Sequence, residues 1–137
     1  MDAVLQSLFA GLPYYLLHSV TALSMLAASV AVYVLVTPYP ELRLVRDGNT
    51  AAAVSLSGAV VGLALPIAFT LAFSVSVLDI VIWGSVALVM QLVAYVVVWL
   101  LLRELPRRIK EGELGAAILL AAIKIAVAAI NAAAIAG

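Results

Sequence analysis

The stretch Arg46-Asp47-Gly48-Asn49-Thr50-Ala51-Ala52-Ala53-Val54-Ser55-Leu56-Ser57-Gly58 contains a charged turn, a helix start and an apolar helix with a stripe of small residues. The same order recurs at an offset of 64 residues, which separates Gly48 from Gly112. At this offset Arg46-Asp47-Gly48 matches Lys110-Glu111-Gly112, and Gly58 and Gly62 align with Ala122 and Ala126. The recurrence predicts a duplicated helical hairpin.

The composition predicts an integral membrane protein. The 137 residues are 67% hydrophobic and 10% charged, with a mean hydropathy of +1.28. Soluble domains carry about 25% charged residues, which they need to cover their surface. The net charge is zero, so no basic field is available to attract nucleic acid. The absence of cysteine excludes disulfides, thiolate metal sites and cysteine nucleophiles.

Four transmembrane helices are expected in a single domain, residues 1–137. No charge occurs between Tyr14 and Val36, a span long enough for a hydrocarbon core that needs about 20 residues. Residues 2–11 are interpreted as an interfacial lead-in. The stretch 50–102 carries one charge, Asp79, and must fold back once near residues 74–79. The last span covers 114–136. The hairpins are thus predicted at about 13–73 and 78–137, joined internally by polar loops at 41–48 and 103–113.

The basic residues predict the orientation in the membrane. Six of them lie in the two polar loops, and none lies in the N-terminal tail or in the 74–79 turn: Arg43, Arg46, Arg103, Arg107, Arg108 and Lys110. By the positive-inside rule both loops are cytoplasmic and both termini lie outside. The first and third spans therefore run in the same direction, and the two repeats are related by an axis along the membrane normal.

Small residues on the second and fourth spans predict close helix packing. Gly58-x-x-x-Gly62 places two glycines on one helix face, and Ala122 and Ala126 are their counterparts. Helices in lipid associate through close van der Waals contact, which small residues permit. Pro66 cannot donate to the carbonyl of Gly62, so a kink is expected there. The freed carbonyl could bind a cation, but a neighbouring polar group or a water more often satisfies it.

Lys124 is the sharpest functional candidate, because it lies in the middle of the last span. A charge at that depth costs roughly 2.5–3.5 kcal/mol on insertion scales, so it needs water or a partner. A separate stripe suited to lipid is formed by Leu119, Ile123, Val127 and Ile130. The expected mid-membrane polar site combines Lys124 with four further side chains, namely Gln91, Asn131, Ser24 and Ser57. Lys124 could instead snorkel to the cytoplasmic surface or be hydrogen-bonded in the core.

A second polar layer is expected nearer the outside, from His18 and Asp79. A histidine–aspartate pair could relay protons. A helix-starting aspartate and a separately hydrogen-bonded histidine explain the same residues and are the preferred interpretation.

Several motifs resemble the YjfL-type inner-membrane family, known as domain of unknown function 350. They are Asn49-Thr50-Ala51-Ala52, Ser57-Gly58-x-x-x-Gly62, Pro66, Trp83-Gly84, Ala87-Leu88-Val89, Gln91-Leu92 and Asn131-Ala132-Ala133. The resemblance runs from about residue 33 to the C-terminus and implies a four-helix protein of the bacterial inner membrane. It implies no catalytic residue. Lys124 departs from the family's pattern, which has a small residue there.

These observations lead to two hypotheses for the function, neither of them enzymatic, because the short loops leave no soluble domain for an active site. In the first, a homo-oligomer in the lipid bilayer forms a permeation or transport path for a small ion or solute, lined by Gln91, Lys124 and Asn131. In the second, the chain is an accessory or scaffold subunit that packs against other membrane proteins. A water-accessible Lys124 favours the first, and a dry Lys124 at a protein contact favours the second. No cofactor or metal is expected, and nucleic acid is not a partner.

Overall fold

The computed structural model describes all residues, 1–137, and is entirely helical. Four helices are long and apolar enough to cross a membrane: α1 (Asp2–Val36), α3 (Thr50–Phe73), α4 (Val77–Leu101) and α6 (Leu114–Ala136). Two short helices, α2 (Glu41–Arg46) and α5 (Leu105–Lys110), lie in the connections. The prediction of four spans and an all-helical membrane fold is confirmed.

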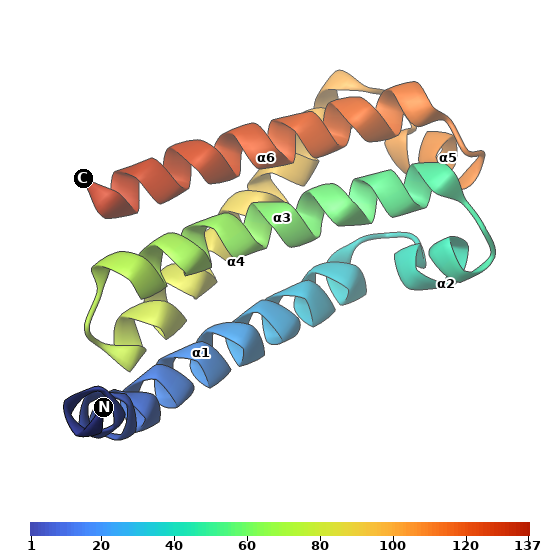
Figure 1. The fold of residues 1–137 in the computed structure, drawn as a ribbon. Coiled ribbons are helices and arrows are strands. Elements are labelled where there is room, and N and C mark those ends of the chain that lie inside the picture. Colours follow the sequence, from blue (N-terminus) through green and yellow to red (C-terminus); the bar gives the residue numbers. More distant parts are fainter.

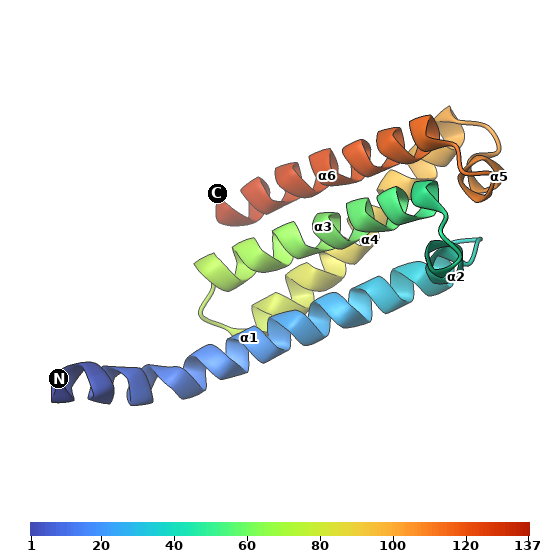
Figure 2. The same cartoon turned by 45° about the vertical axis from the view of Figure 1, so that its right-hand side comes forward.

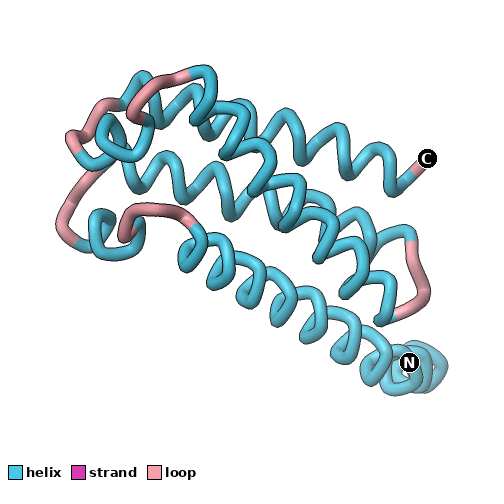
Figure 3. Tube along the Cα trace, turned by 180° about the vertical axis from the view of Figure 1, so that it is seen from behind, coloured by secondary structure: helices cyan, strands magenta, loops and turns pink.

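The chain brings both termini and the 74–76 turn to one end of the bundle, and α2 and α5 to the other (Figure 1). Figure 3 shows the same arrangement from behind, with the loops gathered at the two ends. α1 and α4 therefore run in the same direction. α3 is the central helix, because it packs against α1, α4 and α6, and its longest contact is with α6.

Local sequence explains where the helices begin and end. Pro38 and Pro40 follow the end of α1, as expected for residues that cannot continue a helix. Asn49 caps α3, since its Oδ1 accepts a hydrogen bond from the backbone N–H of Ala52 at 2.9 Å. Gly48 and Gly112 have positive φ angles of 86° and 82°, the left-handed conformation that commonly ends a helix.

One expectation about the connections was wrong. The stretches 41–48 and 103–113 are not simple polar loops, because each contains a helix with a buried apolar or polar face. Leu105 and Ile109 of α5 are fully buried and pack in the largest apolar cluster. Residues 2–11, interpreted as an interfacial lead-in, form the first turns of α1, which bend away from the bundle and project beyond it (Figure 2).

The α3–α6 contact depends on small residues. A Cβ built on Gly58 would lie 2.6 Å from both Cα and Cβ of Ala121. Real Cβ atoms do not approach so closely, so only glycine lets these two backbones come together at this point. Gly58 therefore lies at the close helix contact that its motif predicts, and Gly62 and Pro66 are also buried on α3.

Candidate functional site

Lys124 lies at the centre of the bundle, and its side chain is fully buried. Its ammonium donates to the hydroxyl of Tyr33 on α1 and, at 3.3 Å, to the backbone carbonyl of Ser55 on α3. The nitrogen also lies 4.4 Å from the centre of the Tyr33 ring, a cation–π contact. One charged side chain on α6 thereby links this helix to both α1 and α3.

Ser55 links this lysine to a buried carboxyl group. The Ser55 hydroxyl donates to Glu41 Oε1 at 3.2 Å, and the Tyr39 hydroxyl lies 3.3 Å from Ser55 Oγ. Since Ser55 has a single hydroxyl proton, Tyr39 is the donor in the second contact. Glu41 is fully buried, although it belongs to the short helix α2. We call the set Glu41, Tyr39, Ser55, Lys124 and Tyr33 the polar cluster.

Glu41 and Lys124 do not form a direct ion pair, since Ser55 lies between them. Burial raises the pKa of the Glu41 carboxyl, while the charge of Lys124 and the hydrogen bond from Ser55 partly oppose the rise. Burial, followed by the nearby Glu41 carboxyl, raises the pKa of Tyr39 as well. The Glu41 Oε2 and Tyr95 hydroxyl oxygens have no hydrogen-bond partner within the chain. Chemically, the cluster can bind or release a proton at Glu41 and can accept a hydrogen-bonding water.

Gln91 on α4 lies beside the cluster and joins three helices. Its Nε2 donates to the carbonyl of Gly62 at 3.3 Å and to the carbonyl of Lys124 at 3.1 Å. The Gly62 carbonyl is the one that Pro66 leaves without a helical donor, because proline has no N–H. A Cβ on Gly62 would lie 2.7 Å from the Gln91 amide nitrogen. The expected kink carbonyl is therefore satisfied by a neighbouring side chain rather than left open for a cation.

The structure brings together only part of the predicted mid-membrane site. Lys124 and Gln91 are adjacent and buried, but Ser24 and Ser57 are exposed on the bundle surface, and Ser57 bonds to the backbone carbonyl of Ala53. Their inclusion was wrong, because these two serines lie on the exposed faces of α1 and α3, whereas Lys124 points into the bundle. Asn131 is half-buried, and its Nδ2 has no partner within the chain.

The packing residues expected on α6 do not face the interior of the bundle. Ala122 and Ala126 are exposed, whereas Ala117, Ala121 and Ala128 face the bundle with Lys124. Of the predicted lipid-facing stripe, Leu119 and Ile130 are exposed, but Ile123 and Val127 are half-buried. The counterparts of Gly58 and Gly62 therefore do not contribute to packing within one chain.

His18 and Asp79 do not form a pair. The ring nitrogens of His18 lie 2.9 Å from the Tyr14 carbonyl and 3.2 Å from the Val75 carbonyl. Asp79, in the first turn of α4, accepts a hydrogen bond from the hydroxyl of Ser74. The preferred interpretation, a helix-starting aspartate and a separately bonded histidine, describes this geometry, and the proton-relay pair is not formed.

Sequence reasoning missed Glu41, Tyr33, Tyr39 and Ser55. A signal for Glu41 was present, because the offset of 64 residues aligns it with Leu105, an apolar residue at the start of α5. No group of three or more histidine, cysteine, aspartate or glutamate residues is arranged to hold a metal ion.

Comparisons with known proteins agree with the membrane fold. Residues 7–135 match the model of the family described as Domain of Unknown Function (DUF350). The chain is 31% identical over 106 residues to UPF0719 inner membrane protein YjfL of Escherichia coli (strain K12), and equally to its counterpart in Escherichia coli O157:H7. Each alignment covers 77% of this chain and 77% of the relative. No solved structure matches. The chain therefore belongs to the DUF350 family, as an integral membrane protein whose relatives are inner membrane proteins.

Proposed function

We propose that this protein is a non-enzymatic scaffold subunit of a larger membrane assembly, in which the polar cluster holds helices α1, α3 and α6 in register. The observation that carries the proposal is the complete burial of Lys124 among groups of the same chain. A charge held by fixed acceptors at a dry contact is a device for helix association in lipid, where apolar burial provides no driving force.

A permeation path is the second candidate. It is weakened by the positions of its expected lining residues, because Gln91 and Lys124 are 1% and 0% exposed and face helix contacts rather than a channel. It is supported by buried oxygens without partners, Glu41 Oε2, Gln91 Oε1 and the Tyr95 hydroxyl, which water entering the bundle would satisfy. Such water would form a path from the α2 end of the bundle to the middle of the membrane.

Self-association through α6 forms part of the proposal. Ala122, Ala126, Ala129 and Ala133 are exposed at spacings of four, three and four residues, which places them on one helix face. Small residues in this pattern let a second helix approach closely in lipid. Ala122 and Ala126 then pack between chains rather than within one.

We also propose that the chain contains an internal duplication and that it has a fixed orientation in the membrane. The bounds of α2 and the start of α3 recur as the bounds of α5 and the start of α6 at the offset of 64 residues, and the ends of α3 and α6 agree to within one residue. We expect the two hairpins to superpose by a rotation of about 180° about an axis parallel to the membrane normal, as for parallel repeats. The excess of basic residues around α2 and α5 supports a cytoplasmic location for that end, in an inner membrane.

The experiment combines the mass of the detergent-solubilised protein with ion flux in liposomes. The proposal expects a mass that is a multiple of 14.3 kDa, no potassium, chloride or proton flux above empty liposomes, and the same result for Lys124→Gln. Ala126→Trp should lower the mass to one chain, and Val89→Trp, at an exposed position on α4, is the control. Flux whose ion selectivity changes with Lys124→Gln would replace the scaffold function with permeation.

A further inference from the structure

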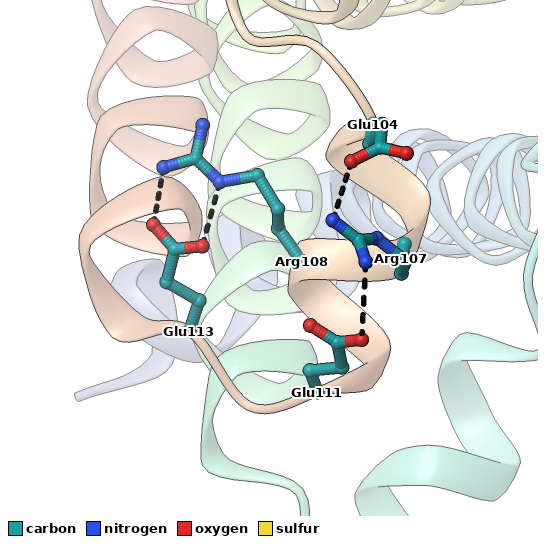
Figure 4. Close-up of polar contacts among 5 residues, drawn as sticks. All are labelled: Glu104, Arg107, Arg108, Glu111 and Glu113. Carbon is teal, nitrogen blue, oxygen red and sulfur yellow. Dashed lines mark hydrogen bonds and ion pairs between the residues drawn. The ribbon is translucent and has the colours of Figure 1, made fainter.

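Arg43 and Arg46 differ from the other basic residues near them. Both are exposed on α2 and take part in no ion pair. In contrast, Arg107 pairs with Glu104 and Glu111, and Arg108 pairs with Glu113 (Figure 4). Residues three apart lie on the same side of a helix, so the two unpaired guanidinium groups form one local positive charge.

The two arginines border a hollow of about 560 Å³ between α2 and the end of α1. The remainder of its lining is mainly apolar and comes from the end of α1, the linker and α2: Val34, Leu35, Thr37, Pro38, Tyr39, Pro40 and Leu42. The positive charge therefore lies at the rim of an apolar surface rather than over a polar one.

A second, wholly apolar groove of about 610 Å³, lined mainly by α1, lies next to this hollow. Val34, Leu35 and Leu42 line both spaces, so the two are adjacent. The groove extends along the transmembrane part of the bundle, past Ala27 and Ala31 on α1 and Val60 on α3. A cationic rim next to a long apolar groove at the end of a membrane span matches a lipid, whose charged headgroup would contact the rim and whose apolar acyl chain would lie in the groove.

We propose that α2 and the α1 groove form a binding site for one anionic phospholipid, with Arg43 and Arg46 on the phosphate and an acyl chain in the groove. The planar guanidinium group donates paired hydrogen bonds to phosphate oxygens. Ala27 and Ala31 leave room for a chain beside the helix, and Val34, Leu35 and Leu42 contact its first methylene groups.

The headgroup charge determines the selectivity. A zwitterionic lipid such as phosphatidylcholine carries its own cation, which repels the two arginines and offsets the attraction of its phosphate. Phosphatidylglycerol carries only the negative charge. Since each basic residue near an anionic surface favours binding by several-fold, two arginines correspond to a preference of roughly tenfold or more for phosphatidylglycerol over phosphatidylcholine.

The test is native mass spectrometry of the delipidated full chain in detergent, titrated with phosphatidylglycerol or phosphatidylcholine of identical acyl chains. Wild type should retain a single phosphatidylglycerol at a concentration at least about tenfold lower than phosphatidylcholine, as two charges require. Arg43→Gln/Arg46→Gln should remove this preference. Arg107→Gln, which changes an arginine already paired with glutamates, should keep it.

A second variant and a competitor test the two halves of the site separately. Ala31→Trp fills the groove and should weaken the binding of both lipids, while inorganic phosphate at the same concentration should not displace phosphatidylglycerol. An unchanged preference in the double arginine variant would overturn the site, as would unchanged lipid binding in Ala31→Trp. Displacement by phosphate alone would assign the arginines to a soluble anion instead.

Discussion

Replacing Lys124 tests how the polar cluster stabilises the bundle. Lys124→Met removes a charge that donates to Tyr33 and Ser55 and that lowers the cost of burying Glu41. Breaking a buried charge pair by removing one partner typically costs about 3–5 kcal/mol. We expect a value near the lower limit, about 3 kcal/mol, because Glu41 can bind a proton and Tyr33 can donate elsewhere.

A double-mutant cycle with Glu41→Gln separates the pair from the packing. The introduced amide keeps an acceptor for Ser55 but carries no charge, so Lys124→Met should cost less in its presence. The coupling between the two positions should be about 1–2 kcal/mol, within the range for groups in one network. Without Glu41, a buried lysine could be replaced by an apolar side chain at little cost, as is often found for complete removal of buried ion pairs.

The assay is reversible unfolding by sodium dodecyl sulfate in mixed micelles at pH 7, followed by circular dichroism. Lys110→Met is the matched control, because Lys110 is exposed and makes no ion pair, and its effect should stay within about 0.5 kcal/mol. A Lys124→Met effect no larger than this control would refute the reasoning, as would independent effects at positions 41 and 124.

Gly58→Leu should destabilise the bundle strongly, because even a Cβ would overlap Ala121, whereas Leu119→Phe on the lipid-facing side should leave unfolding unchanged; equal effects would contradict the packing. Burial raises the pKa of Glu41 above its ordinary 4.5, so the folded state holds the proton more tightly, and the free energy of unfolding should fall as pH rises from 4.5 through the folded pKa. Glu41→Gln should abolish this slope, and an identical slope in that variant would assign it to another group. Because the chain has no cysteine, Arg43→Cys and Arg108→Cys each introduce a single thiol, which should be labelled from the cytoplasmic side only. Terminal tags should be accessible from outside, and a cytoplasmic C-terminus would reverse the sidedness.

The spans and their ends could be predicted because each depends on local sequence. A charge-free run of membrane length and a proline pair define α1, and the Asn49 cap defines the start of α3. On α6, Ala117, Ala121 and Ala128 share a face with Lys124 at helical spacing and all are buried, but the alignment with Gly58 and Gly62 pointed to Ala122 and Ala126 instead. These features are contained within single helices and require no knowledge of how helices pack.

The partners of Lys124 could not be predicted, because they depend on rotation and on the path of the loops. Position along the helix axis grouped Ser57 with Lys124, but the ammonium donates to the backbone carbonyl of Ser55. The side chain of Ser55 lies about 200° around the helix from that of Ser57 and enters the polar cluster. Glu41 was expected to be exposed to water, because charged residues in loops usually are exposed. Only the fold of α2 against α3 brings this carboxyl group into the bundle.

Thiol labelling at position 124 tests the central claim most directly, namely that Lys124 lies at a dry contact. With no native cysteine in the chain, Lys124→Cys carries a single thiol, and Arg43→Cys provides an exposed reference. We expect a charged methanethiosulfonate reagent in native membranes to modify the Arg43→Cys variant readily and to leave the Lys124→Cys variant unmodified from either side. Modification of Lys124→Cys at a rate comparable with that of Arg43→Cys, in protein that keeps its assembly mass, would show a water-filled route to the middle of the bundle and contradict this claim.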